Sequence, residues 1–121
     1  LAMDNSYFCS KNTNYPFNIQ SIMVKHVVLF RFRKDVDFEI RKKVSERFRA
    51  EIMALPSKLD FIRGLEVGFN INEVETWDIC LCGVFDNLDD VRSYSLFPDH
   101  QAAAAALKPY LDGRSCVDYE I

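Results

Sequence analysis

The sequence predicts one α+β domain in which helices cover one face of an antiparallel sheet. Three observations predict it: four segments are rich in β-branched and aromatic residues, two regions have helical character, and their order is β-α-β-β-α-β. A chain of 121 residues is long enough for one hydrophobic core and too short for two.

Residues 1–22 differ from the rest of the chain because they are polar, rich in Asn and Ser, and show no sustained period. We expect them to be an N-terminal extension, either a non-native or a disordered segment. The domain is then expected to span residues 23–121, with Met23 at its start.

The first strand is predicted over residues 24–33, where apolar residues occupy both faces. His26, Val28 and Phe30 share one face by alternation, and Val27 and Leu29 share the other. The helix that follows is predicted from one apolar stripe at three- and four-residue spacing. That stripe consists of Val36, Ile40, Val44, Phe48, Ile52 and Leu55, with Asp35 or Asp37 as the N-cap and Pro56 near the end.

The second and third strands are predicted over residues 62–71 and 77–85. The first of these segments alternates apolar and polar residues, as a half-buried strand does, whereas the second is apolar on both faces. Asn, Glu and Thr residues between them supply the turn.

A second helical region follows the third strand. A short helix is expected over residues 88–94, Pro98 restarts the chain, and the alanine run 102–106 favours a further helix. Gly113 is expected to end that helix, and residues 115–121 to form the last strand.

This order is the ferredoxin-like arrangement, with both helical regions on one face of the sheet. The helices leave the other face uncovered, although the first and third strands are apolar on both faces. A second copy of the chain, packed sheet against sheet, would cover it. We therefore predict a homodimer through the sheet face, a dimeric α/β barrel.

Composition excludes several classes of function. The net charge of −3 and the pI of about 5.3 argue against binding nucleic acid, and no apolar run is long enough to span a membrane. No secretory signal and no glycine-rich phosphate loop is recognisable. Cys80, Cys82 and Cys116 lack the spacing of a zinc site. We expect a cytoplasmic protein with reduced cysteines, no metal and no cofactor.

Four short motifs resemble the stress-responsive dimeric A/B barrel (Dabb) family over residues 23–121. They are the opening Val24-Lys25-His26, the Tyr-x-x-x-Pro-x-His of residues 94–100, Lys108-Pro109-Tyr110, and the closing Val-Asp-Tyr-Glu of residues 117–120. The resemblance implies a ferredoxin-like protomer whose sheet joins that of its partner. It implies little about activity, because most members have no assigned reaction.

A plant polyketide cyclase of this family has an acid–base pair in a pocket between the sheet and the helices. The resemblance carries its functional strand histidine to His26, its tyrosine to Tyr94 and its second histidine to His100. Two wall positions differ: its mid-helix aromatic residue is matched by Val44, and its late-helix tryptophan by Leu111. The substrate is therefore not transferable.

Each candidate catalytic residue also has an ordinary structural interpretation. His26 could be a hydrogen-bonded core residue, His100 an anchor at a helix start, and Tyr94 a packed ring with its hydroxyl in water. The candidate walls of a substrate-binding pocket are Val28, Phe30, Val44, Phe48 and Leu81, all of which also suit an ordinary core.

The sequence thus predicts an A/B barrel protein of uncharacterised activity, with a small apolar pocket for an aromatic or carbonyl-bearing metabolite. One alternative is a cofactor-free enzyme resembling a polyketide cyclase or a monooxygenase. In a cyclase-like reaction, His100 would be the general base, and His26 or Tyr94 would polarise a carbonyl. The other alternative is a purely structural, stress-related dimer.

Overall fold

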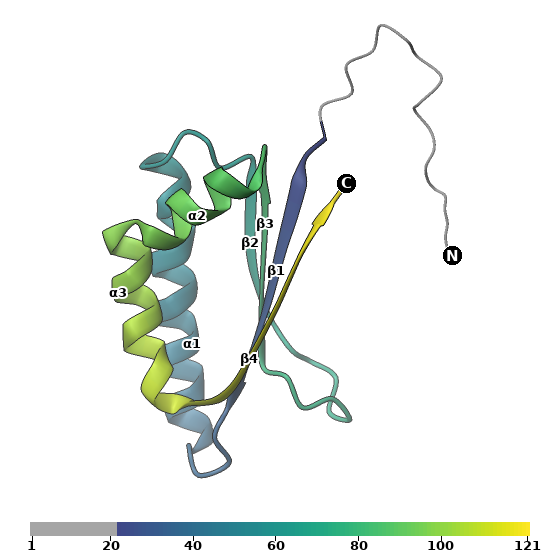
Figure 1. Cartoon of the computed structure of the whole chain (residues 1–121). Helices are drawn as coiled ribbons and strands as arrows, with labels where there is room; N and C mark the ends of the chain where they lie inside the picture. The colour runs from purple at the N-terminus through teal and green to yellow at the C-terminus, as the bar shows by residue number, and fades with distance from the viewer. Residues whose placement is uncertain (1–21) are drawn as a thin grey trace, which may run out of the picture.

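The computed structural model of the chain describes residues 22–121, in which a single sheet is covered by helices on one side (Figure 1). The four strands are antiparallel to their neighbours and lie in the order β2-β3-β1-β4. They are β1 (Val24–Phe32), β2 (Gly64–Phe69), β3 (Ile79–Phe85) and β4 (Leu111–Glu120). The helices are α1 (Phe38–Met53), α2 (Leu88–Leu96) and α3 (Pro98–Leu107), with short 3-10 turns at η2 (Leu55–Ser57) and η3 (Lys108–Tyr110).

This arrangement confirms the predicted α+β, ferredoxin-like fold. The prediction for residues 1–22 lies outside the described residues, except at Ile22. Among residues 22–121, no helix has both the length and the apolar character needed to cross a bilayer.

Local signals set most of the helix boundaries. The side chain of Asp37 accepts a hydrogen bond from the Ile40 N–H at 3.0 Å, which caps α1 as the sequence indicated. Asn87 caps α2 in the same way, accepting from the Asp90 N–H at 2.8 Å. Pro98 opens α3, at the first helical position that tolerates proline.

The prediction that Gly113 ends a helix is wrong, because α3 already ends at Leu107 and Gly113 lies inside β4. Pairing with β1 extends β4 back to Leu111, so long-range hydrogen bonding overrides the local helix-ending signal. The glycine has a different role here. A Cβ at this position would lie 2.8 Å from Nη2 of Arg31, so glycine leaves room for the guanidinium group.

The hydrophobic core lies between the inner face of the sheet and the helices. In β1 and β3 every second residue is buried, and α1 contributes Phe48 and Ile52. Ile52, Leu55 and Phe85 have no exposed surface at all, and burying each such side chain stabilises the fold by about 1.5–3 kcal/mol. Phe48 and Ile52 of the stripe predicted for α1 therefore belong to the core, whereas Ile40 is exposed and Val44 lies toward α3.

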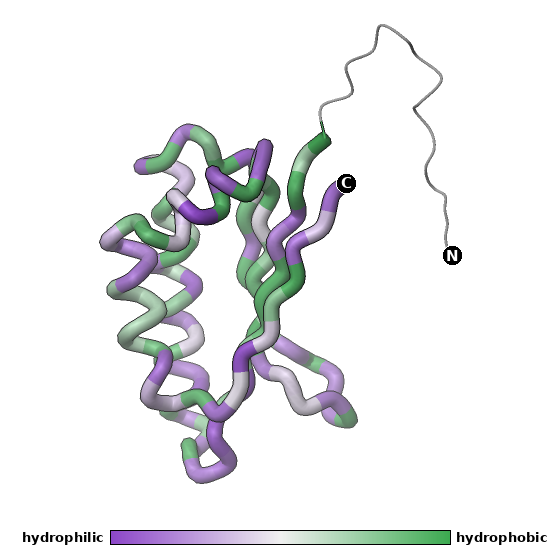
Figure 2. Tube along the Cα trace, in the orientation of Figure 1, coloured by the Kyte–Doolittle hydropathy of each residue, from purple (hydrophilic) through white to green (hydrophobic). Residues whose placement is uncertain are grey.

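Within the described part of the chain, no helix lies over the outer face of the sheet (Figure 1). It nevertheless contains apolar side chains, and Figure 2 shows apolar residues along the strands. Val27 and Leu29 of β1 are half-buried there, whereas Val117 and Tyr119 of β4 are 54% and 45% exposed. An uncovered apolar surface of this kind is a typical protein interface.

Candidate active site

The first candidate residue, His26, lies on the inner face of β1 beside the edge strand β4. The register places Asp118 of β4 directly opposite His26, and the two side chains meet with Nδ1 2.5 Å from Oδ1 of the carboxylate. His26 is only 5% exposed. A carboxylate that accepts the Nδ1–H proton leaves Nε2 as the basic atom of the neutral ring. Asp118 therefore fixes the orientation of the His26 ring, as carboxylates hydrogen-bonded to histidines do in many acid–base sites.

On the other side of His26, a glycine makes space for aromatic packing. Gly83 of β3 is the residue opposite His26, and a Cβ there would lie 2.7 Å from the ring of Phe85. The Phe85 ring therefore lies edge-on to His26, with ring centroids 6.3 Å apart, and packs on Tyr94 at 5.1 Å.

Tyr94 lies between the two histidines of the chain. It belongs to the last turn of α2, while His100 belongs to the first turn of α3, directly after the Pro98 restart. The Tyr94 ring centroid is 4.5 Å from that of His100 and 6.0 Å from that of His26. The fold thus brings together His26, Tyr94 and His100, all three candidate catalytic residues.

Two polar atoms of this cluster are buried without a hydrogen-bond partner among the described residues: the Tyr94 hydroxyl and Nδ1 of His100. Tyr94 has no exposed surface. An unsatisfied buried polar group costs about 1–3 kcal/mol, so proteins retain few of them without a reason. Tyr94 does not line the cavity described below, whereas His100 does.

Burial sets the protonation states of these two groups. It raises the pKa of the Tyr94 hydroxyl far above its usual value, so the tyrosine remains a proton donor at neutral pH. Burial also lowers the pKa of His100, and the neighbouring His26 and Arg114 act in the same direction, while the backbone of Ser95 raises it. His100 is therefore neutral at pH 7, the state that a general base requires.

A cavity of about 430 Å³ opens beside this cluster, between the inner face of the sheet and helices α1–α3. His26 and His100 both line it, as do four of the predicted walls, Val28, Phe30, Phe48 and Leu81. The fifth predicted wall, Val44, lies elsewhere: it lines a separate space of about 50 Å³ between α1 and α3. Leu111 also lines the larger cavity.

Sequence reasoning missed the polar residues that β4 and the ends of the helices contribute. Asp118 orients His26, and Ser95, Lys108 and Arg114 line the cavity. Alternation along β4 puts Arg114, Cys116 and Asp118 on one face, but only the register with β1 reveals that this face meets His26. That register is a long-range property, so no local signal reports it.

His26, Cys116 and Asp118 each offer one potential metal-ligand atom, all within 4.8 Å of one another. Burial, followed by the charge of Asp118, raises the pKa of the Cys116 thiol, which disfavours the thiolate that metals bind. Nδ1 of His26 is already engaged by Asp118. The expectation that the protein uses no metal stays a prediction.

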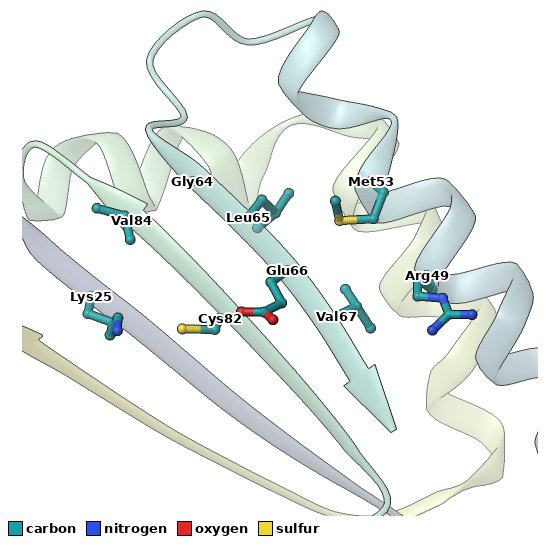
Figure 3. A pocket seen from close by; sticks show the side chains of 9 residues that line it. All are labelled: Lys25, Arg49, Met53, Gly64, Leu65, Glu66, Val67, Cys82 and Val84. Atoms are coloured by element: carbon teal, nitrogen blue, oxygen red, sulfur yellow. The ribbon is translucent and has the colours of Figure 1, made fainter. Parts of the chain in front are cut away.

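A second, larger cavity of about 560 Å³ lies along the edge strand β2 (Figure 3). Side chains from α1, β1, β2 and β3 surround it, including Arg49, Glu66 and Lys25. No histidine or tyrosine of residues 22–121 lines it. It is also more open to solvent than the cavity beside His26, which therefore stays the candidate site.

The fold and this cavity define a ferredoxin-like α+β protein with a histidine-lined site in the protomer. The chain belongs to the stress responsive A/B barrel domain family, whose family model matches residues 24–121. A search among curated proteins found no match.

Solved structures agree with this assignment. A dimeric protein of unknown function with a ferredoxin-like fold, from Bacteroides fragilis, is 49% identical and has a TM-score of 0.80, with 82% of this chain and 96% of that chain covered. A dimeric ferredoxin-like protein of unknown function from Thermobifida fusca is 24% identical, with a TM-score of 0.71 over 86% of this chain and 95% of that one. A hydroxynitrile lyase from Passiflora edulis shares the fold at 16% identity, with a TM-score of 0.68 over 84% and 95% of the two chains.

Proposed function

We propose that this A/B barrel protein binds a small aromatic or carbonyl-bearing metabolite in the cavity beside His26. The observation that supports the proposal most is the cavity of about 430 Å³ itself, in which His26 and His100 meet mainly apolar walls. Apolar walls with a few convergent polar groups are typical of small-molecule sites. Phe30 and Phe48, with ring centroids 5.4 Å apart, provide an aromatic wall against which a flat ligand packs.

Catalysis without a cofactor is the second candidate function. His100 is neutral and would accept a proton, while the Tyr94 hydroxyl or His26 would donate to a developing oxyanion. The contact of Asp118 with Nδ1 of His26 supports the tautomer that has its proton on Nδ1. Cyclisation, isomerisation and lyase reactions are the classes to test, and a hydroxynitrile lyase from Passiflora edulis has the same fold.

We further propose that two copies associate through the outer faces of their sheets, giving the dimeric α/β barrel expected from the sequence. The exposed Val117 and Tyr119, together with the half-buried Val27 and Leu29, supply the apolar surface. The similar proteins from Bacteroides fragilis and Thermobifida fusca are dimeric, which supports this assembly. Cys80, Cys82 and Cys116 are free thiols, which supports a reducing, cytoplasmic location.

Titration with acetophenone, a small aromatic ketone, tests ligand binding. The chain has only two histidines, so their imidazole NMR signals report directly on the cavity. We expect both signals to shift and saturate together, and His100→Gln to weaken binding at least several-fold. Lys42→Gln, on the exposed side of α1, is the matched control and should leave binding unchanged. Histidine signals that stay unmoved by acetophenone would reject the site, and unchanged affinity in His100→Gln would remove His100 from it.

A further inference from the structure

Of the two cationic side chains at the cavity, Arg114 differs from most arginines elsewhere in the described chain, whereas Lys108 is unpaired like most of the described lysines. Arg31, Arg63 and Arg92 each form an ion pair with an aspartate at 2.7–2.9 Å. Lys108 and Arg114, in contrast, form no ion pair within residues 22–121. Both are exposed, and both line the cavity beside His26.

The cavity therefore has a positive lining in a protein whose net charge is −3. Lys108 lies directly after α3, and Arg114 lies on the inner face of β4. Two separate elements of the fold therefore each contribute one cationic side chain to the lining of the same cavity. Among the described residues, no aspartate or glutamate lines it. The neighbouring carboxylates are already engaged: Asp118 contacts His26, and Asp112 pairs with Arg31.

The behaviour of His100 agrees with a positive field inside the cavity. After burial, the neighbouring His26 and the charge of Arg114 lower its pKa, while the backbone of Ser95 raises it. The other group packed on His100, the Tyr94 ring, is neutral. An anion bound between Lys108 and Arg114 would screen these charges and raise the pKa of His100.

We propose that the cavity takes an organic acid: an apolar, aromatic body against Phe30 and Phe48, and a carboxylate held by Arg114 and Lys108. The planar guanidinium binds a carboxylate through two parallel hydrogen bonds, and the lysine adds a compact charge. The carboxylate lies at the exposed cations, and the carbonyl end faces His26 and His100, which line the same cavity. The inference rests on the proposed function, because it names the class of ligand for the same site.

Two probes of one shape test the charge alone: 4-acetylbenzoate, which is an anion at pH 7, and its neutral methyl ester. We expect the anion to bind about tenfold more tightly than the ester, and Arg114→Gln and Lys108→Gln each to remove most of that preference. Lys42→Gln keeps it, because Lys42 lies on the exposed side of α1. The imidazole signal of His100 should also titrate at higher pH in the presence of the anion.

The outcomes separate this inference from the proposed function. If the ester binds as tightly as the anion, the acid preference is overturned while the small-molecule site stands. If the preference persists in both the Arg114 and the Lys108 variants, these cations are not its source, and the inference fails. If neither probe moves the histidine signals, the proposed site itself is rejected, and the inference falls with it. Unchanged near-ultraviolet circular dichroism of each variant shows that a lost preference is not a folding defect.

Discussion

Replacing Tyr94 by phenylalanine should make the ligand-free protein more stable. The Tyr94 side chain is fully buried, and its hydroxyl has no partner among the described residues. The substitution keeps the ring, and with it the packing on Phe85 and His100 at 5.1 and 4.5 Å. It removes only an unsatisfied polar group, whose burial costs about 1–3 kcal/mol. We therefore expect the free energy of unfolding to rise by about 1 kcal/mol or more, or roughly 4 °C in Tm.

Urea unfolding measures this change directly, since a higher midpoint at an unchanged slope reports stability alone. Wild type and variant must be compared at equal protein concentration, because the stability of a dimer depends on it. Tyr110→Phe is the control: Tyr110 is half-exposed, so its variant should lie within about 0.5 kcal/mol of wild type. The same Tyr94→Phe variant should bind acetophenone more weakly, by up to about tenfold. A Tyr94→Phe protein that is less stable by 1 kcal/mol would refute the reasoning, because the hydroxyl would then have a partner.

Three further predictions concern stability and assembly. The pKa of His100 is lowered in the folded state, so the unfolded chain binds that proton first as the pH falls, and stability should decline below about pH 6.5. Urea midpoints measured from pH 4.5 to 8 should show that His100→Gln flattens this decline. Parallel profiles for the wild type and the variant would contradict the prediction. Ile52→Ala removes a fully buried side chain and should cost about 2–5 kcal/mol by the same assay; a loss under 1 kcal/mol would mean that α1 does not pack as described. Val117→Glu places a charge on the outer face of the sheet and should yield monomers in sedimentation velocity. The control, Ile71→Glu, lies in a loop where Ile71 is 96% exposed and should remain dimeric. A dimeric Val117→Glu variant would place the interface elsewhere.

Local patterns were sufficient for most of the fold. Alternation placed His26 on the same face as Val28 and Phe30, and the structure buries all three together. The cap of α1 at Asp37 and the restart at Pro98 are local features too, and both were readable from the sequence. Period and capping depend on neighbours within a few residues, so they can be read without knowing the tertiary structure.

The parts that the sequence did not reveal depend on β4. In its local sequence Gly113 has the appearance of a helix end, because its pairing with Arg31 of β1 is a long-range contact that no local pattern reports. For the same reason Asp118 was not recognised as the partner of His26, and Arg114 was not placed at the cavity. Val44 was expected at the cavity on its helical stripe, but the stripe is wide enough to face two separate spaces. A cavity forms where side chains do not fill the space between them, so it depends on their three-dimensional packing.

The central claim is that each protomer of a dimer has its own binding cavity beside His26 and His100. Native mass spectrometry of the protein with acetophenone tests this claim most directly, because it counts chains and ligands in one measurement. We expect a dimer that binds two acetophenone molecules, one in each protomer. A monomer would contradict the proposed sheet-to-sheet assembly, and a dimer that binds a single molecule would move the site from the protomer cavity to the interface.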